Sequence, residues 1–379
     1  MYMSSGIPSI SFYSDKQIIS CKKENNTKNK TITCQPALHT IAFSNRCDCV
    51  GFPQIPPQVT PDLYQHPVLE MLIQKEIFSM VPSHSKLQKT CTSLSIPGDF
   101  KDEFSQIERD TFYLRDPSFS LIGKKYKSQN RYTDALSTDE WLFRLNDPKV
   151  RLTFEGWKKQ MMDWDKHTDC PYINATRVGS HSGDIITQGP LSKTEDNFWK
   201  MAWKAKASIV VMLTPLYEDA KGKSSHYFPE VQGESFSFGE YFKIKVRLIQ
   251  ELERNGFVNK ELIMEHAGKE RALSIIHCSD WQDKQTYPID RLLWLVIYSA
   301  GFAKGNPLIA HCSAGIGRSG TFYACYLIYH CWKHRNGSLT VDVQGLVKFL
   351  RLYRPGLIHT AEQYAIIFDF IKALNAYPR

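Results

Sequence analysis

Residues 311–321, which read H-C-S-A-G-I-G-R-S-G-T, constrain the fold of this chain more than any other stretch. They follow the apolar run 307–310, which predicts a short buried strand, and they precede a helical pattern. The residues on the apolar face of that helix are Phe322, Cys325, Ile328 and Trp332. A cysteine and a glycine-rich loop therefore lie between a strand and the N-terminus of a helix.

This loop has the composition of a phosphate-binding site. Its three glycines permit backbone angles that a Cβ would forbid, so successive N–H groups can surround an anion at the start of the helix. Arg318 adds a planar fork of donors for two phosphate oxygens. The same positive field lowers the pKa of a thiol and favours a thiolate on Cys312. Ser319 can donate its hydroxyl to that thiolate and help it leave in a second step.

The alternative is an ordinary turn in which Cys312 is a buried packing residue, the usual interpretation of a lone cysteine. The joint spacing of cysteine, glycines, arginine and serine favours phosphate chemistry instead. The stretch resembles the H-C-x-x-x-x-x-R-S/T loop of cysteine-dependent protein tyrosine phosphatases, in the form found in their tyrosine-selective branch. The resemblance implies that His311 supports the cysteine. It also implies that the loop binds the phosphoryl group through Ser313, Ala314, Gly315, Ile316 and Gly317.

Composition indicates an ordinary globular protein rather than a nucleic-acid or membrane protein. The chain has 379 residues and a net charge of +8, and we expect no nucleic-acid binding because no Lys/Arg block is dense. No apolar run is long enough to predict a membrane span. A reduced Cys312 favours a reducing, cytoplasmic location. A metal site near Cys47 and Cys49 is an alternative to solvated loop thiols, but the spacing lacks further ligands.

The chain is predicted to divide near residue 99. Residues 1–98 are polar and proline-rich, so we expect an N-terminal extension of low order with one amphipathic helix over 68–81. That helix either packs on the main domain or binds a partner or a membrane surface, although its face is not basic. Residues 99–379 open with a helix whose apolar positions are Phe100, Phe104 and Ile107. The strands expected after it are 207–213, 242–248, 262–266 and 272–277, and the helices are 288–303, 320–334, 341–353 and 361–374.

This order of elements predicts an α/β (α+β) fold for residues 99–379, with one twisted mixed sheet flanked by helices on both faces. The family resemblance covers the same residues and implies a single protein tyrosine phosphatase domain. An insertion over 141–168, rich in charge and tryptophan, is longer than the family norm, and we expect an extra helix at the rim of the cleft.

A thiolate that attacks a phosphate ester needs a proton donor for the leaving oxygen. The segment Trp281–Gln282–Asp283 resembles the mobile Trp-Pro-Asp loop of the family, which implies that Asp283 is the general acid and then the base that activates water. Gln282 replaces the family's proline, and residues 284–287 are one residue longer and more polar than usual. These departures from the family pattern put closure of the loop in doubt, but the acidic residue Asp283 itself is retained. An isolated Trp-x-Asp is usually a surface turn.

Two further segments resemble binding and supporting loops of the family. Residues 130–134 resemble the phosphotyrosine-recognition loop, in which Tyr132 would form one wall of a deep slot and Asp134 would bind peptide N–H groups. The alternative is a polar loop. In residues 218–223, the resemblance implies that Glu218 pairs with Arg318 and that Lys223 approaches the acid. The alternative is a solvated charged turn.

Residues 354–363 resemble the loop that places the hydrolytic water. Gln363 is kept there, whereas His359 replaces the first of the family's two glutamines. An imidazole differs from an amide in geometry and charge state. We therefore expect breakdown of the phosphoenzyme to be slower than its formation, which would give a burst.

The sequence predicts a phosphatase that hydrolyses phosphotyrosine in proteins through a phosphocysteine intermediate, without a metal or organic cofactor. One rival is a phosphotyrosine-binding module without turnover, motivated by Gln282 and His359. Another is a broader phosphatase for phosphoserine or lipid, against which Tyr132 argues. The loop departures and the extension are similar to phosphatases of polydnaviruses (bracoviruses) of parasitoid wasps. That resemblance implies interference with phosphotyrosine signalling in the cytosol of infected insect cells.

Overall fold

The computed structural model describes residues 78–79, 97–145, 154–163, 170–178, 183–303, 305–334 and 340–377. The chain divides into two compact units, 1–60 and 61–379, and the first lies wholly outside the described residues. The cysteines at 34, 47 and 49, most of the residues 1–98 predicted to be of low order and most of the predicted helix 68–81 also lie outside them. The boundary at residue 98 stays a prediction.

One part of the predicted helix 68–81 is wrong. Phe78–Ser79 form strand β1, which pairs antiparallel with β12 (Thr340–Val341). The backbone groups of these two residues are satisfied by a distant strand rather than within a helical turn. Because Val341 belongs to β12, the helix predicted over 341–353 begins two residues later, at Val343. Its N-cap is Asp342, whose side chain accepts a hydrogen bond from the N–H of Gly345.

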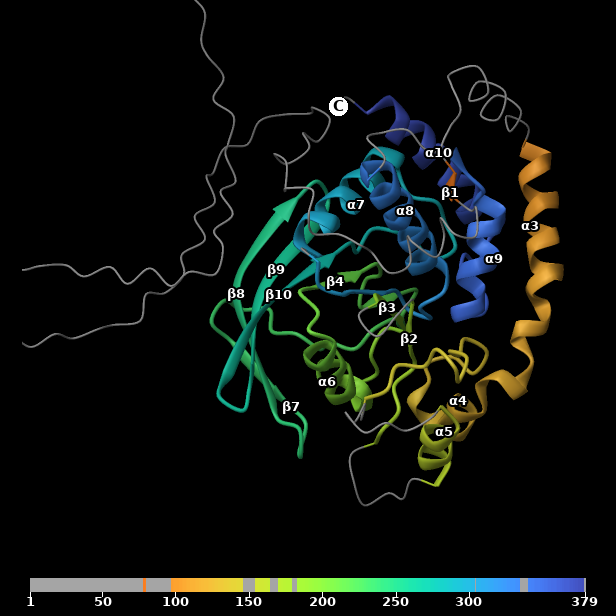
Figure 1. The fold of residues 1–379 in the computed structure, drawn as a ribbon. Coiled ribbons are helices and arrows are strands. Elements are labelled where there is room, and N and C mark those ends of the chain that lie inside the picture. The colour runs from red at the N-terminus through yellow and green to blue at the C-terminus, as the bar shows by residue number, and fades with distance from the viewer. Residues whose placement is uncertain are drawn as a thin grey trace, which may run out of the picture. The chain divides into compact units, whose positions relative to one another are not determined.

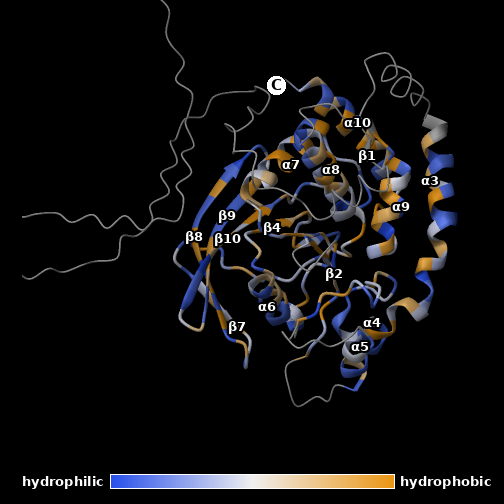
Figure 2. Ribbon diagram, in the orientation of Figure 1, coloured by the Kyte–Doolittle hydropathy of each residue, from blue (hydrophilic) through white to orange (hydrophobic). Residues whose placement is uncertain are grey.

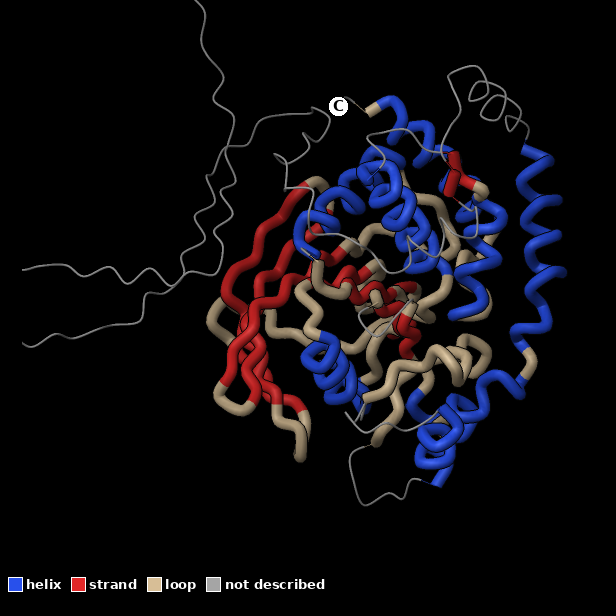
Figure 3. The backbone as a smooth tube through the Cα atoms, viewed as in Figure 1, coloured by secondary structure: helices blue, strands red, loops and turns tan. Residues whose placement is uncertain are grey.

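The centre of the fold is an eight-stranded mixed sheet in the order β2-β3-β11-β4-β10-β9-β8-β7 (Figures 1 and 3). Its strands are β2 (Ala175–Arg177), β3 (Ile185–Thr187), β4 (Ile209–Met212), β7 (Ser235–Phe238), β8 (Ile244–Arg254), β9 (Phe257–His266), β10 (Lys269–His277) and β11 (Leu308–His311). The four strands β3, β11, β4 and β10 are mutually parallel, and the remaining pairs are antiparallel. The predicted mixed sheet is confirmed. A separate hairpin joins β5 (Tyr217–Glu218) and β6 (Lys221–Gly222).

Helices cover both faces of this sheet, as predicted, with α6 on one face and α7 and α8 on the other (Figure 1). The α-helices are α3 (Pro97–Thr111), α4 (Leu121–Lys125), α5 (Phe154–Asp163), α6 (Glu195–Ala205), α7 (Ile289–Ala303), α8 (Gly317–His334), α9 (Val343–Tyr353) and α10 (Ala361–Ala376). Short 3₁₀ turns are η2 (Phe112–Arg115), η3 (Pro117–Ser120), η4 (Lys127–Gln129) and η5 (Ser192–Thr194). No helix in these described parts of the chain is long and apolar enough to cross a membrane.

The central strands are buried on both faces, because parallel strands covered by helices on each side meet no solvent. On β4, Val210 and Met212 join the core cluster that contains Trp199 of α6. The intervening residues Ile209 and Val211 are also fully buried and point to the opposite face. Figure 2 shows β4 as hydrophobic, whereas β8 and β9 carry many hydrophilic residues.

The strand register brings the functional loops to one edge of the sheet. His311, the last residue of β11, lies beside Thr187 of β3 and Met212 of β4. His277, the last residue of β10, lies beside the same Met212. Because the four strands are parallel, the loops that follow them emerge together at their carboxyl ends, where ligands bind in open α/β sheets. These loops carry the predicted cysteine, acid and charged-turn residues.

Candidate active site

Cys312 lies between β11 and α8 with only 3% of its surface exposed. Its Sγ is 3.5 Å from the hydroxyl oxygen of Ser319. Burial opposes ionisation of the thiol, but the guanidinium of Arg318, the Ser319 hydroxyl and backbone N–H groups of the loop outweigh it and lower the pKa of Cys312. The site thus favours a thiolate, the nucleophilic form.

The loop is shaped as an anion cradle by two features. Gly315 has φ +72°, and a Cβ there would collide with the carbonyl oxygen of Thr187. Arg354 donates from Nε to the Gly315 carbonyl at 2.8 Å and from Nη2 to the Ala314 carbonyl at 3.0 Å. Since the C=O and N–H of a peptide unit point in opposite directions, these bonds leave the loop N–H groups facing away from Arg354. Sequence reasoning missed Arg354 as a site residue, although it begins the segment 354–363.

Arg318 is buried, with 1% of its surface exposed, and it links the loop to two carboxylates. Its Nη1 donates to the carbonyl oxygen of Trp281 at 2.6 Å. Its Nη2 lies 3.6 Å from Glu218 Oε2 and 3.5 Å from Asp283 Oδ1. Within the described structure, Nε and Nη2 have no hydrogen-bond partner. Two buried donors of this kind match two of the three oxygens of a phosphoryl group.

Asp283 is held beside Arg318 by the turn that carries Lys223. Lys223 Nζ is 3.0 Å from Asp283 Oδ2 and 3.2 Å from Glu218 Oε2, and Glu218 Oε1 accepts the backbone N–H of Asp283 at 2.8 Å. Partial burial raises the pKa of Asp283, but the cations Arg318 and Lys223 prevail and lower it. Both pairings predicted for Glu218 and Lys223 are present, so the segment 218–223 is not merely a solvated turn.

The rim of the site is formed by residues 130–134. The Tyr132 hydroxyl lies 3.0 Å from the hydroxyl of Ser313, and the ring is 36% exposed. The guanidinium of Arg131 fixes this segment by donating to the carbonyl oxygens of Gly189, Pro190 and Gly222. Asp134 is exposed at the outer end of the segment. Arg131 was not predicted, because its ligands are backbone carbonyls that leave no mark in the sequence.

Gln363 and His359 lie over the first residue of α8. Gln363 is fully buried, its Oε1 accepts the His359 N–H at 3.0 Å, and its Nε2 has no hydrogen-bond partner among the described residues. A Cβ at Gly317 would be 3.2 Å from that Nε2, so the amide borders the cradle. Partial burial and the charge of Lys284 lower the pKa of His359, which keeps its imidazole neutral near neutral pH.

His311, the last residue of β11, supports the loop through hydrogen bonds of its imidazole ring. Its Nδ1 donates to the Cys312 carbonyl at 3.1 Å, so its Nε2 accepts the Tyr227 hydroxyl at 2.7 Å. Burial lowers the pKa of His311 to about 3, and the ring is therefore neutral. The remaining loop residue, Ile316, accepts the backbone N–H of Ile358 at 3.0 Å, which joins the cradle to segment 354–363.

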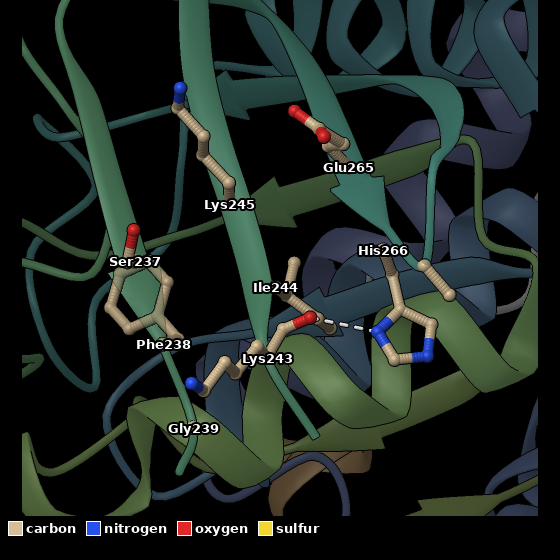
Figure 4. Close-up of a pocket in the computed structure, with 9 residues that line it drawn as sticks. Ser237, Phe238, Gly239, Lys243, Ile244, Lys245, Glu265 and His266 are labelled. Carbon is tan, nitrogen blue, oxygen red and sulfur yellow. Dashed lines mark hydrogen bonds between the residues drawn. The ribbon is translucent and has the colours of Figure 1, made fainter. Parts of the chain in front are cut away.

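A hollow of about 480 Å³ lies elsewhere, between β7, β8 and the β9–β10 turn. Figure 4 shows Lys243, Lys245, Glu265 and His266 around it, with a hydrogen bond of 2.7 Å between His266 Nδ1 and the Lys243 carbonyl. None of the predicted site residues lines this hollow. Cys312, Asp283 and the segment 218–223 lie instead in the loops at the carboxyl ends of the parallel strands.

Comparisons with known proteins agree with this geometry. The family model described as Protein-tyrosine phosphatase matches residues 126–373, more than half of the chain. The chain is 36% identical over 239 residues to tyrosine-protein phosphatase non-receptor type 7 of Mus musculus, covering 61% of the chain and 62% of that relative. It is 31% identical over 261 residues to tyrosine-protein phosphatase non-receptor type 13 of Mus musculus, covering 66% and 10%. It is 32% identical over 288 residues to receptor-type tyrosine-protein phosphatase eta of Mus musculus, covering 72% and 21%. The chain thus spans less than two thirds of the length of each of these relatives.

Proposed function

The chain belongs to the protein-tyrosine phosphatase family, and from that premise we propose that it hydrolyses phosphotyrosine in proteins through a phosphocysteine intermediate. The observation that carries the proposal is the pair of buried donors on Arg318, Nε and Nη2, which have no hydrogen-bond partner in the described structure although Nη2 lies within ion-pair distance of Asp283. They lie beside the cradle that holds Cys312. A dianionic phosphoryl group satisfies these donors and presents its phosphorus to the sulfur.

In the first step, the Cys312 thiolate attacks phosphorus, the bond from phosphorus to the tyrosyl oxygen breaks, and protonated Asp283 gives its proton to that oxygen. In the second step, Asp283 takes a proton from water, the water oxygen bonds to phosphorus, and the sulfur leaves as a thiolate. Ser319, 3.5 Å from Sγ, stabilises that leaving thiolate. Arg318 and the loop N–H groups stabilise the charge on the phosphoryl oxygens in both steps.

Selectivity for phosphotyrosine rests on Tyr132 in this proposal. Its ring stands at the rim while Cys312 is almost fully buried, so a long aryl phosphate reaches the sulfur more readily than the short side chain of phosphoserine. Asp134 stays a proposed ligand for peptide N–H groups. A comparison of turnover on phosphotyrosine and phosphoserine peptides of equal sequence tests this; equal rates would favour the broader phosphatase.

Stopped-flow turnover of a phosphotyrosine peptide tests the activity. We expect turnover by the wild type, none by Cys312→Ser, and a loss of about 10²–10⁴-fold for Asp283→Ala, the usual contribution of general acid catalysis. Because His359 replaces an amide beside Gln363, we expect a burst of tyrosine release followed by a slower steady state. A single phase without a burst would show that dephosphorylation is not the slow step.

The rival function, a phosphotyrosine-binding module without turnover, is favoured by Gln282 and His359. The same experiment distinguishes this rival from the phosphatase. If the protein is only a binding module, the wild type and Cys312→Ser bind the peptide equally well, and neither releases phosphate from it. Circular dichroism of both proteins supplies the control for folding.

For location, we propose the cytosol, because a reduced thiolate at Cys312 is needed and relatives include non-receptor phosphatases. The resemblance of the loop departures to polydnavirus phosphatases extends the proposal to host phosphotyrosine proteins in infected insect cells. Expression of wild type and Cys312→Ser in insect cells tests it, since only the wild type should lower total phosphotyrosine.

A further inference from the structure

The loop that carries Asp283 lacks the proline that would stiffen it, yet it lies against Arg318. Proline fixes φ, whereas Gln282 leaves it free. Lys284, two residues after Gln282, has φ +60°, in the left-handed region that disfavours residues with a Cβ. Local backbone preference therefore does not hold this conformation, and side-chain contacts must do so.

Besides the contacts of Glu218, Lys223 and Arg318 with the loop, a second set meets at Asp280, the residue just before the loop. Its Oδ1 accepts the hydroxyl of Tyr287, at the far end of the loop, at 2.9 Å. Its Oδ2 is ion-paired with Arg291 in the first turn of α7. The rings of Trp281 and Tyr287 stack with centroids 5.0 Å apart and an interplanar angle of 18°. Thus one carboxylate joins the end of β10, the end of the loop and the start of α7.

We propose that Asp280, Tyr287 and Arg291 form a clasp that keeps the loop closed, so that Asp283 faces the leaving oxygen. In this chain the clasp supplies the rigidity that proline would otherwise give. All three are positioning residues, since in the described structure none forms a hydrogen bond or ion pair with the cradle 312–319. The inference rests on the proposed phosphatase function and adds residues to it.

Burial decides which member of the clasp matters most. Tyr287 is 4% exposed, and burial together with Cys278 and Asp280 raises the pKa of its phenol, so the hydroxyl remains a donor at all working pH values. The side chains of Asp280 and Arg291 are 40% and 36% exposed, and an ion pair at such exposure contributes little by itself. The hydrogen bond from the Tyr287 hydroxyl to the Asp280 carboxylate is charge-assisted and largely shielded from water, so it is the principal contact of the clasp.

Tyr287→Phe tests the clasp, because it removes only the hydroxyl and keeps the stacked ring. We expect kcat on a phosphotyrosine peptide to fall about tenfold, the effect of losing a hydrogen bond to a charged group, with KM nearly unchanged. Asp280→Asn keeps an acceptor for Tyr287 and should lose less. Tyr241→Phe is the matched control, since Tyr241 is 70% exposed and lies outside the loop.

Two readouts separate positioning from a general structural effect. On an aryl phosphate whose leaving group is more acidic than a tyrosine phenol, such as p-nitrophenyl phosphate, the departing oxygen depends less on a proton, so the loss caused by Tyr287→Phe should shrink. In an Asp283→Ala background, Tyr287→Phe should cause no further loss, because it acts through Asp283. Full additivity, or equal losses on both substrates, would overturn the clasp. Inactive wild type would instead overturn the proposed function, and faster amide exchange of residues 281–287 in Tyr287→Phe would then still support the clasp.

Discussion

At the scale of single residues, the carboxylate of Asp283 lies beside two cationic side chains, Arg318 and Lys223. A general acid must be protonated, so in the free enzyme activity falls as pH rises through the pKa of Asp283. The two cations lower that pKa, which displaces the fall toward acid pH. An arriving phosphate dianion engages Arg318 and opposes this effect, which favours the protonated acid when substrate is bound.

Lys223→Met tests this arrangement. It removes one of the causes that lower the pKa of Asp283, so the alkaline limb of kcat/KM should move to higher pH. Lys221→Met is the matched control, because it removes the same charge from an exposed position on β6. The measurement is kcat/KM over about pH 4 to 8. A limb that moves to lower pH, or moves equally in both variants, would contradict the prediction.

Residues that act through side-chain chemistry were predictable from the sequence, and those that act through the backbone were not. Cys312, Arg318 and Asp283 are each the chemical type that the reaction needs, at spacings that a resemblance can match. Arg131 and Arg354 instead bind carbonyl oxygens, which every residue possesses. A buried arginine of this kind cannot be distinguished in the sequence from a surface one.

At the scale of elements, the insertion 141–168 contains the predicted extra helix, and α5 spans Phe154–Asp163. Trp157 and Met161 of α5 are buried in a cluster with Tyr126 and Tyr172. The Tyr126 hydroxyl donates to the Met161 carbonyl at 2.9 Å. The Tyr172 hydroxyl donates to Oδ1 of Asn130, two residues before Tyr132, at 2.6 Å. The helix therefore supports the base of the recognition segment 130–134.

Trp157→Ala tests that support. Loss of a buried tryptophan costs about 3–5 kcal/mol of packing, and we expect the loosened segment 130–134 to raise KM for a phosphotyrosine peptide severalfold while kcat changes less. Met162→Ala, at a 40% exposed position on the same helix, is the control. A variant that stays folded and loses kcat at unchanged KM would place the effect of α5 on the chemistry instead.

Helices and strands were predicted correctly where buried apolar residues recur at a regular spacing. The prediction failed where a strand pairs with another strand that is distant in the sequence. α8 was predicted because Phe322, Cys325, Ile328 and Trp332 recur on one face, and all four are buried. β1 was not predicted, since Phe78 pairs with Val341, and a partner so far along the chain leaves no local pattern. By contrast, β8 extends to Arg254, beyond the predicted alternation, because β9 follows it after the short turn at Asn255–Gly256 and pairs with it there.

At the scale of the whole molecule, the site exists only when distant segments meet. The cradle of 312–319 is held by Arg354, the rim by Arg131, and the acid by Glu218 and Lys223 of the β5–β6 hairpin segment. An unfolded chain has none of this geometry, so an oxyanion that fits the cradle binds the folded state alone. Binding of that kind stabilises the fold by mass action.

We therefore expect inorganic phosphate to raise the unfolding temperature of the wild type. At about 100 times Kd the gain in the free energy of unfolding is about 2.7 kcal/mol, which calorimetry or dye-based melting detects as a shift of several degrees. Sodium chloride at equal ionic strength controls for general salt effects. In Arg318→Met the two buried donors are absent, so phosphate should give no more than the chloride shift. An equal phosphate shift in Arg318→Met and wild type would mean that the anion binds outside the cradle, and that Arg318 is not the residue that joins the distant segments to the substrate.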